Sequence, residues 1–419
     1  MKLFQRLLVA PAALGLMAPL AANADVTAIS TDSDLNSEVI QARVDGVEAQ
    51  LGEVMAGQFS STTKLTGKAA FITGYVDNDS ATDNDEITGE YMYQLNLNTS
   101  FTGEDDLYTR IKSGNVADHF KDKNQGTYLS AANGNADVLK VDKLWYSFPV
   151  GESLQVWVGP KIENYYMLAS APSIYKPVTK QFALGGNGSA YGSSTSPGFG
   201  VAWTQQKEDP SEARLAISAN YTSKDGASDT IGISNDDGRS FFLTKVEYGS
   251  PNWQVSAAVA KKNAPTDTEN GYDDYFHTPL ASNTEGDLTA YGLRAYWKPD
   301  ETGSIPQVQV GYDFGSYDEA TAGEAEDIAG WMIGLGWPDL FVDGNRGGFA
   351  FGSRMSATEV KSGGSVTEDP AEDNTVWEAY YTFKVNDGVS ITPAIFGGTD
   401  VEESGKDTQG AVLLTEFRF

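Results

Sequence analysis

The chain has 419 residues, with 58 acidic side chains, 29 basic side chains and no cysteine. A net charge of −29 argues against a nucleic-acid partner, and the lack of thiols excludes disulfides, a thiolate nucleophile and cysteine-ligated metals. Forty-four glycines, 20 tyrosines and 19 phenylalanines suit a large all-β protein with many turns.

Residues 1–24 have the three parts of a secretory signal peptide. Lys2 and Arg6 give a positive start, an apolar run covers 7–20, and 22–24 read A-N-A, a small-residue cleavage pattern. The apolar run is too short to span a membrane, and no later stretch approaches 18 apolar residues. We therefore expect export, a mature chain that begins at Asp25, and no membrane-spanning helix.

Residues 25–57 predict a periplasmic linker followed by a short helix. Its apolar residues recur with the 4-3-4-3 spacing of a coiled-coil seam, namely Ile40, Val44, Val47, Leu51 and Val54. The seam covers about two heptads and contains Gly46, so this helix needs a partner to bury it. We expect a coiled coil that joins identical subunits. The alternative is a helix lying on its own barrel.

Residues 58–419 predict a series of strands of roughly ten residues with period-2 hydrophobicity. In 90–101 the odd positions are mostly aromatic or aliphatic, and the even positions are mostly Gln, Asn or Ser. The chain ends in a similar strand, 409–419, which finishes Phe-Arg-Phe. Sixteen strands are expected, near 63–75, 90–101, 107–114, 138–149, 153–162, 198–205, 213–221, 239–248, 253–261, 288–297, 305–314, 329–337, 348–355, 377–384, 389–396 and 409–419.

The connections between these strands alternate in length. Short connections carry turn residues, near 103–105, 150–152, 249–252 and 386–388. Long connections lie near 115–137, 163–197, 222–238, 262–287 and 356–376. Short periplasmic turns, long outer loops and an even number of strands define a transmembrane antiparallel β-barrel, and closure removes the edges that lipid cannot tolerate. The predicted fold is therefore an all-β barrel of about 16 strands in the outer membrane, in contact with its lipid.

A barrel of 16 strands is too wide for side chains to fill, so we expect an aqueous channel for passive diffusion of small solutes. The connection 163–197 is the longest, and we expect it to fold inward as a constriction that carries Glu163, Tyr165, Tyr166, Lys176 and Lys180. The alternative is a loop lying over the mouth of the barrel.

Charge is expected to differ between the loops and the lumen. Acidic residues cluster in the predicted outer loops, whereas strand alternation places mostly basic residues inside. The basic residues expected to line the pore are Arg110, Lys112, Lys143, Lys161, Arg214, Arg294, Arg354 and Arg418. Lys68 and Lys384 have the same parity. An acidic rim above a basic lumen favours small anions or neutral polar solutes.

Several sequence runs resemble the cyanobacterial outer-membrane porins of the carbohydrate-selective OprB type, the Som-like group. They are the leader 1–16, A-G-Q-F-S-S-T-T-K-L-T-G-K-A-A-F at 56–71, L-N-L-N-T-S-F-T-G at 95–103, L-W-Y-S-F-P-V-G at 144–151 and the run 376–396. The resemblance implies a homotrimeric channel for small solutes such as sugars and inorganic ions. That family usually carries an S-layer homology domain before the coiled coil. Here only 25–37 precede the helix, which leaves cell-wall anchoring unsupported.

Three functions other than that of a porin are compatible with parts of the sequence. An outer-membrane enzyme needs a nucleophile and a base, but the only histidines, His119 and His277, fall in predicted loops, and no G-x-S-x-G motif occurs. A calcium-binding adhesin would use the acidic loops, yet the stretch that begins at Asp32 lacks the glycine and the final glutamate of an EF-hand. A plugged barrel with a structural role in the envelope would have the same strands as a porin. We expect no catalytic residues, no metal site and no cofactor.

Overall fold

The computed structural model describes residues 62–78, 86–186, 189–192, 195–264, 277–282, 284–363, 374–402 and 405–419. The chain divides into two units at Gln58 and Phe59, and the second unit contains all the described residues. The predicted signal peptide and the coiled-coil seam lie outside them, so both stay predictions.

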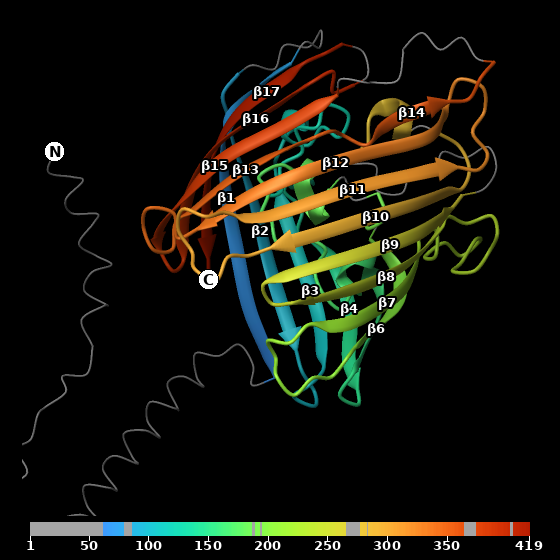
Figure 1. Ribbon diagram of the computed structural model, residues 1–419, viewed down its shortest axis with the longest axis horizontal. Helices are drawn as coiled ribbons and strands as arrows, with labels where there is room; N and C mark the ends of the chain where they lie inside the picture. The colour runs from blue at the N-terminus through green and yellow to red at the C-terminus, as the bar shows by residue number, and fades with distance from the viewer. Residues whose placement is uncertain are drawn as a thin grey trace, which may run out of the picture. The chain divides into compact units, whose positions relative to one another are not determined.

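The described chain is almost entirely antiparallel β-structure (Figure 1). Its helical pieces are the short 3₁₀ helices η1 (Asp118–Phe120), η2 (Asn164–Tyr166) and η3 (Lys180–Gly185), together with α3 (Pro279–Ser282). No helix in the described part of the chain is long and apolar enough to cross a membrane. The strands are β1 (Thr63–Asn78), β2 (Thr88–Thr99), β3 (Asp106–Gly114), β4 (Lys140–Val150), β5 (Leu154–Ile162), β6 (Ser196–Thr204), β7 (Arg214–Ser223), β8 (Ser240–Ser250), β9 (Trp253–Asn263), β10 (Leu288–Trp297), β11 (Gln307–Tyr317), β12 (Ala325–Pro338), β13 (Arg346–Gly352), β14 (Ser356–Val360), β15 (Thr375–Asn386), β16 (Val389–Thr399) and β17 (Thr408–Arg418).

The sheet closes on itself. Apart from β14, each strand pairs with the next one along the barrel, and β1 pairs with both β2 and β17, with Lys68 opposite Gln94 on one side and Arg418 on the other. β13 and β14 both pair with β12, so together they occupy one position in the barrel, interrupted at 353–355. Seventeen strands therefore fill sixteen positions, which confirms the predicted sixteen-stranded antiparallel barrel.

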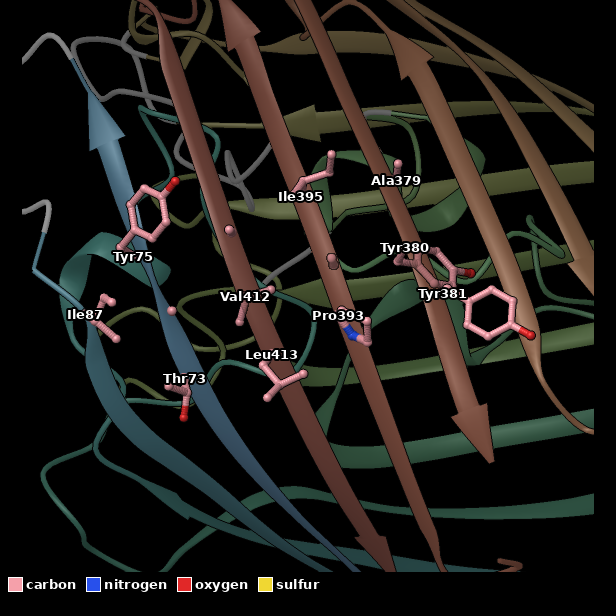
Figure 2. Close-up of a pocket in the computed structure, with 13 residues that line it drawn as sticks. Thr73, Tyr75, Ile87, Ala379, Tyr380, Tyr381, Pro393, Ile395, Val412 and Leu413 are labelled. Atoms are coloured by element: carbon pink, nitrogen blue, oxygen red, sulfur yellow. The ribbon is translucent and has the colours of Figure 1, made fainter. Parts of the chain in front are cut away.

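The outer face of the barrel is apolar, as lipid contact requires. Large hydrophobic side chains are exposed at alternate positions; for example, Phe71 on β1 is 53% exposed, while its neighbours Ala70 and Ile72 are fully buried. Figure 2 shows part of this face, where Thr73, Tyr75, Pro393, Ile395 and Leu413 surround a shallow apolar hollow over β1 and β15–β17. A water-soluble sheet would bury this face, so the alternation supports a barrel with lipid outside.

The space inside the barrel holds three separate apolar clusters. In the largest, Phe120 and Leu129 of the β3–β4 connection pack against wall residues such as Ile72 and Val412. In the second, Leu168 and Tyr191 of the β5–β6 connection pack against β8–β12. The third groups Trp145, Ile162 and Met167. The β3–β4 and β5–β6 connections therefore both pack inside the barrel, where the sequence predicted only the β5–β6 connection to do so.

Candidate functional site: the barrel lumen

The connection between β5 and β6 folds into the barrel. Its backbone N–H at Ala169 donates to Ser218 Oγ on β7 (2.9 Å), and the one at Ile174 donates to Gln309 Oε1 on β11 (3.1 Å). Ser218 and Gln309 occupy buried positions that alternate with exposed ones, so both point inward. The segment therefore runs along the inner wall.

Glu378 on β15 anchors the tip of this inner loop. The carboxyl group is fully buried and accepts hydrogen bonds from Tyr175 Oη (2.9 Å), the Val178 N–H (3.0 Å), the Thr179 N–H (2.8 Å) and Thr179 Oγ1 (2.7 Å). Each of its oxygens takes two donors. Burial and the adjacent carboxyl group raise the pKa of Tyr175, so this phenol stays protonated and donates.

A second anchor lies on β10 and β11. Arg294 contacts both carboxyl oxygens of Asp313 (2.9 and 2.8 Å), and its Nε donates to the Leu184 carbonyl (2.9 Å). The loop approaches the wall so closely here that a Cβ atom on Gly311 would fall 1.6 Å from the Gly185 carbonyl oxygen. A glycine at the inward position of β11 is what permits this contact.

The beginning of the loop is fixed by ion pairs. Lys143 on β4 contacts Glu163 (2.8 Å), which also accepts hydrogen bonds from Tyr165 and Thr195. Burial alone would raise the pKa of Glu163, but the Lys143 ammonium lowers it below its ordinary value, so this carboxyl group is ionised at neutral pH. Beside it, Arg110 pairs with Asp142 and donates to Tyr166 Oη (3.0 Å).

The β3–β4 connection (115–139) is the second segment inside the lumen. It forms bridge pairs with the inner loop, where the Ser130 N–H donates to the Val178 carbonyl and the Lys180 N–H to the Tyr128 carbonyl (2.7 Å each). The fully buried Arg354 guanidinium donates to the carbonyls of Lys123 (2.6 Å) and Asn124, and to those of His277 and Val401 in two other connections. Arg354 thus links three outer connections.

The structure brings six of the predicted site residues together on β3, β4 and the beginning of the loop: Arg110, Lys112, Lys143, Glu163, Tyr165 and Tyr166. Arg214 lies at the opening by the short turns and donates to the Pro210 carbonyl. Lys180 lies 4.0 Å from the centre of the Tyr128 ring. Lys176 and Arg418 line a cavity inside the barrel.

Several predicted pore-lining residues lie elsewhere than expected. Lys161 is exposed and pairs with Leu144, which lies between the buried residues Lys143 and Trp145. It therefore points outward, because register shifts in both ladders of β5 break the alternation before it. Lys143, Arg294 and Arg354 do point inward, but they are at most 4% exposed. They hold loops in place and do not face water.

A cavity of about 680 Å³ lies between the loop tip and the wall formed by β1, β13 and β15–β17. Five basic side chains line it against two acidic ones: Lys68, Lys176, Arg346, Lys384 and Arg418 against Asp387 and Glu416. Five positive charges minus two negative charges leave +3, the opposite sign to the whole chain. Within the described ranges, no three His, Asp or Glu residues are close enough together to hold a metal ion.

Sequence reasoning missed two residues of this lumen. Arg346 begins β13 two residues before the predicted strand and shares the inward parity of Gly348 and Ala350, so a longer strand assignment would have found it. Asp142 was not among the predicted residues, and a register shift between β3 and β4 turns it toward Arg110. Bulges of this kind leave no clear mark in the hydrophobic pattern.

A closed sixteen-stranded barrel with an apolar outer face and loops folded into its lumen is a channel of the bacterial outer-membrane type. The sequence profile of the carbohydrate-selective porin family OprB matches residues 19–396, so the chain belongs to that family. It is therefore a porin, a passive channel for small solutes.

Two cyanobacterial relatives are uncharacterized proteins. The one from Nostoc sp. strain PCC 7120 is 27% identical over 91% of this chain and 69% of its own length, and the one from Synechocystis sp. strain PCC 6803 is 24% identical over 93% and 75%. The structure of Pseudomonas putida OprB at high pH is similar with a TM-score of 0.57, at 12% identity, covering 85% of this chain and 94% of that one. That likeness concerns the fold.

Proposed function

We propose that this porin lies in the outer membrane and forms a water-filled channel of restricted bore that favours anions over cations. The observation that supports this most is the charge of the inner cavity, where five basic side chains face two carboxyl groups although the chain as a whole carries −29. A lumen with net positive charge raises the local concentration of anions and lowers that of cations. Neutral sugars of suitable size would pass as well, in keeping with the carbohydrate-selective family.

The inner loop supports the restricted bore. It crosses from β5 to β15 and is held by contacts to β7, β10, β11 and β15, and the β3–β4 connection packs on it. We propose that the positive charge along the route comes from six basic side chains, namely Lys176, Arg418, Arg110, Lys112, Lys180 and Arg214. Glu163, Tyr165 and Tyr166 hold the loop. Because two segments share the lumen, we expect a smaller conductance than that of an empty sixteen-stranded barrel.

The test is single-channel recording of the detergent-purified protein in a planar bilayer with a potassium chloride gradient. A reversal potential on the chloride side supports the proposal, and one on the potassium side contradicts the anion preference. Silence from folded, inserted protein would instead support a plugged structural barrel, whose observation in favour is the apolar packing of both inner connections against the wall.

We also propose that the protein is a homotrimer joined through the seam Ile40, Val44, Val47, Leu51 and Val54. Support comes from the heptad spacing, which leaves an apolar stripe on a helix too short to be stable alone. Light scattering of the detergent complex tests it. Val47→Asp is expected to yield monomers, and Gln50→Asp, which adds the same charge outside the seam, is expected to leave the trimer intact. A monomeric wild-type protein would contradict the proposal.

A further inference from the structure

The cavity behind the inner loop contains two kinds of basic side chain. Three of its five cations are already in contact with its two carboxyl groups: Lys68 and Arg418 with Glu416, and Lys384 with Asp387 (2.7 Å). In each of these pairs, which range from partly buried to exposed, the opposite charges offset each other.

Lys176 and Arg346 differ from those three. Neither forms an ion pair or a side-chain hydrogen bond with any residue in the described part of the chain. Lys176 lies at the exposed tip of the inner loop, and Arg346 projects inward from the beginning of β13. Both also line a smaller cavity beside Gln307 and Gln309, so the two side chains lie together at the boundary between the two cavities.

Tyr380 adds a hydrogen-bond donor at the same wall. It lines the larger cavity, its side chain is 9% exposed, and its hydroxyl is buried with no hydrogen-bond partner among the described residues. A Cβ atom on Gly348 would lie 2.6 Å from that hydroxyl, so the Tyr380 hydroxyl lies over Gly348. Gly348 is the inward-facing position that follows Arg346 on β13. A buried donor without an acceptor costs free energy, and a bound acceptor would relieve that cost.

We propose that Lys176, Arg346 and Tyr380 form a binding site for a small tetrahedral oxyanion of the phosphate type. The inference rests on the proposed anion-favouring channel and names the class of anion that the channel retains. A planar guanidinium recognises two oxygens of one phosphate, a lysine ammonium adds a point charge, and a phenol donates to a third oxygen. Two cations that are not paired with protein carboxylates match the charge of a dianion better than that of a chloride ion. Chloride also has no oxygen atoms for the guanidinium and the phenol to contact.

The consequence is that phosphate resides at this position while chloride passes. The test measures chloride current through single channels as phosphate is added, and also measures phosphate binding to the detergent-folded protein by calorimetry. We expect saturable block of the chloride current, with sulfate acting like phosphate and acetate acting more weakly.

Three variants and one control separate a site from a general field. Arg346→Gln and Lys176→Gln should each weaken phosphate binding about tenfold or more, which corresponds to one charge-assisted hydrogen bond. Arg346→Lys keeps the charge but loses the planar guanidinium, so it should still weaken phosphate binding. Lys384→Gln removes one charge from the same cavity but from a cation that already has a partner, so we expect less than about a threefold change.

Equal effects of Arg346→Gln and Lys384→Gln would overturn the site, because net charge alone would then explain the phosphate response. Unchanged phosphate binding in both Arg346→Gln and Lys176→Gln would overturn it as well. If the wild-type protein conducts chloride but shows no phosphate block or binding, this inference fails and the channel stands. If it binds phosphate with the expected variant pattern but conducts nothing, the site stands and the diffusion channel fails.

Discussion

Glu378 offers the sharpest way to test whether the inner loop sets the bore. In the wild-type protein each carboxyl oxygen of Glu378 accepts one hydrogen bond from a backbone N–H, that of Val178 or Thr179, and one from a hydroxyl. In Glu378→Gln one of these two oxygens is replaced by an NH₂ group, which cannot accept. The Tyr175 and Thr179 hydroxyls can turn and accept from the amide, but a backbone N–H cannot. Whichever way the amide is oriented, one backbone donor loses its acceptor.

Docking of the loop tip against the wall should become less favourable by about 3 kcal/mol. One hydrogen bond to a charged group contributes roughly 1.5–3 kcal/mol, and the backbone donor left unsatisfied in a buried place costs roughly 1–3 kcal/mol, partly offset by relaxation. A change of about 3 kcal/mol shifts the equilibrium between docked and undocked tip by roughly two orders of magnitude. The barrel itself should remain folded, because its ladder of strands does not depend on this carboxyl group.

Two measurements report this change. Single-channel recording of Glu378→Gln should show a larger and noisier conductance, and hydrogen exchange should become faster at Val178 and Thr179 while the strands stay protected. Thr382→Val is the matched control, since Thr382 lies on the same strand and its hydroxyl contacts Thr392 on the wall and not the loop. A Glu378→Gln channel with wild-type conductance and wild-type exchange would refute the idea that this carboxyl group holds the constriction.

Three further predictions concern the other contacts inside the lumen. Gly311→Val should displace the loop and alter the conductance, because its Cβ would lie 1.6 Å from the Gly185 carbonyl oxygen. Gly336→Val should not, because a Cβ atom at that position would have no atom within 4 Å. Altered conductance in Gly336→Val alone would contradict this prediction. Arg354→Met should make the 115–139 connection more sensitive to protease, since the Arg354 guanidinium links the carbonyls of Lys123 and Asn124 to two other connections. Equal cleavage of the wild-type protein and the variant would argue against that role. Because the pKa of Glu163 is lowered in the folded protein, its pairing with Lys143 contributes stability above the unfolded pKa of about 4.3, and this contribution is lost as pH falls through the lower folded value. The protection of residues 163–167 against hydrogen exchange, measured relative to the intrinsic rate at each pH, should therefore fall on acidification below about pH 4, and Glu163→Gln should remove that step; a step that persists in the variant would assign it to another group.

The barrel could be predicted from the sequence because its determinants are local. Each strand must present apolar side chains to lipid at every second residue, and each short turn needs residues such as the Asn386-Asp387-Gly388 run, so both features appear within about ten residues. The strand limits were less certain, and β12 begins at Ala325, four residues before its predicted start. Its outer end has acidic residues, which hide the alternation.

The inside of the barrel could be predicted only in part, because its contacts join residues far apart in the chain. Thr179 and Glu378 are 199 residues apart, and Arg354 and Asn124 are 230 apart, so no local pattern indicates that they meet. The inward folding of 163–197 was expected from its length, but the equally deep packing of 115–139 was not. Parity did identify the basic character of the wall, yet it missed Arg346 and could not show that Asp313 neutralises Arg294.

We infer that two inner loops leave a narrow, positively charged route through the barrel, although the whole chain carries a strongly negative net charge. The reversal potential of the purified protein in a potassium chloride gradient tests this most directly, compared between the wild-type protein and the double variant Lys176→Gln/Arg346→Gln. We predict that the wild-type channel favours chloride and that the double variant shifts toward potassium, since two cations without ion-pair partners among the described residues are lost from the cavity. A wild-type channel that favours potassium, or a double variant with an unchanged reversal potential, would contradict a positively charged route.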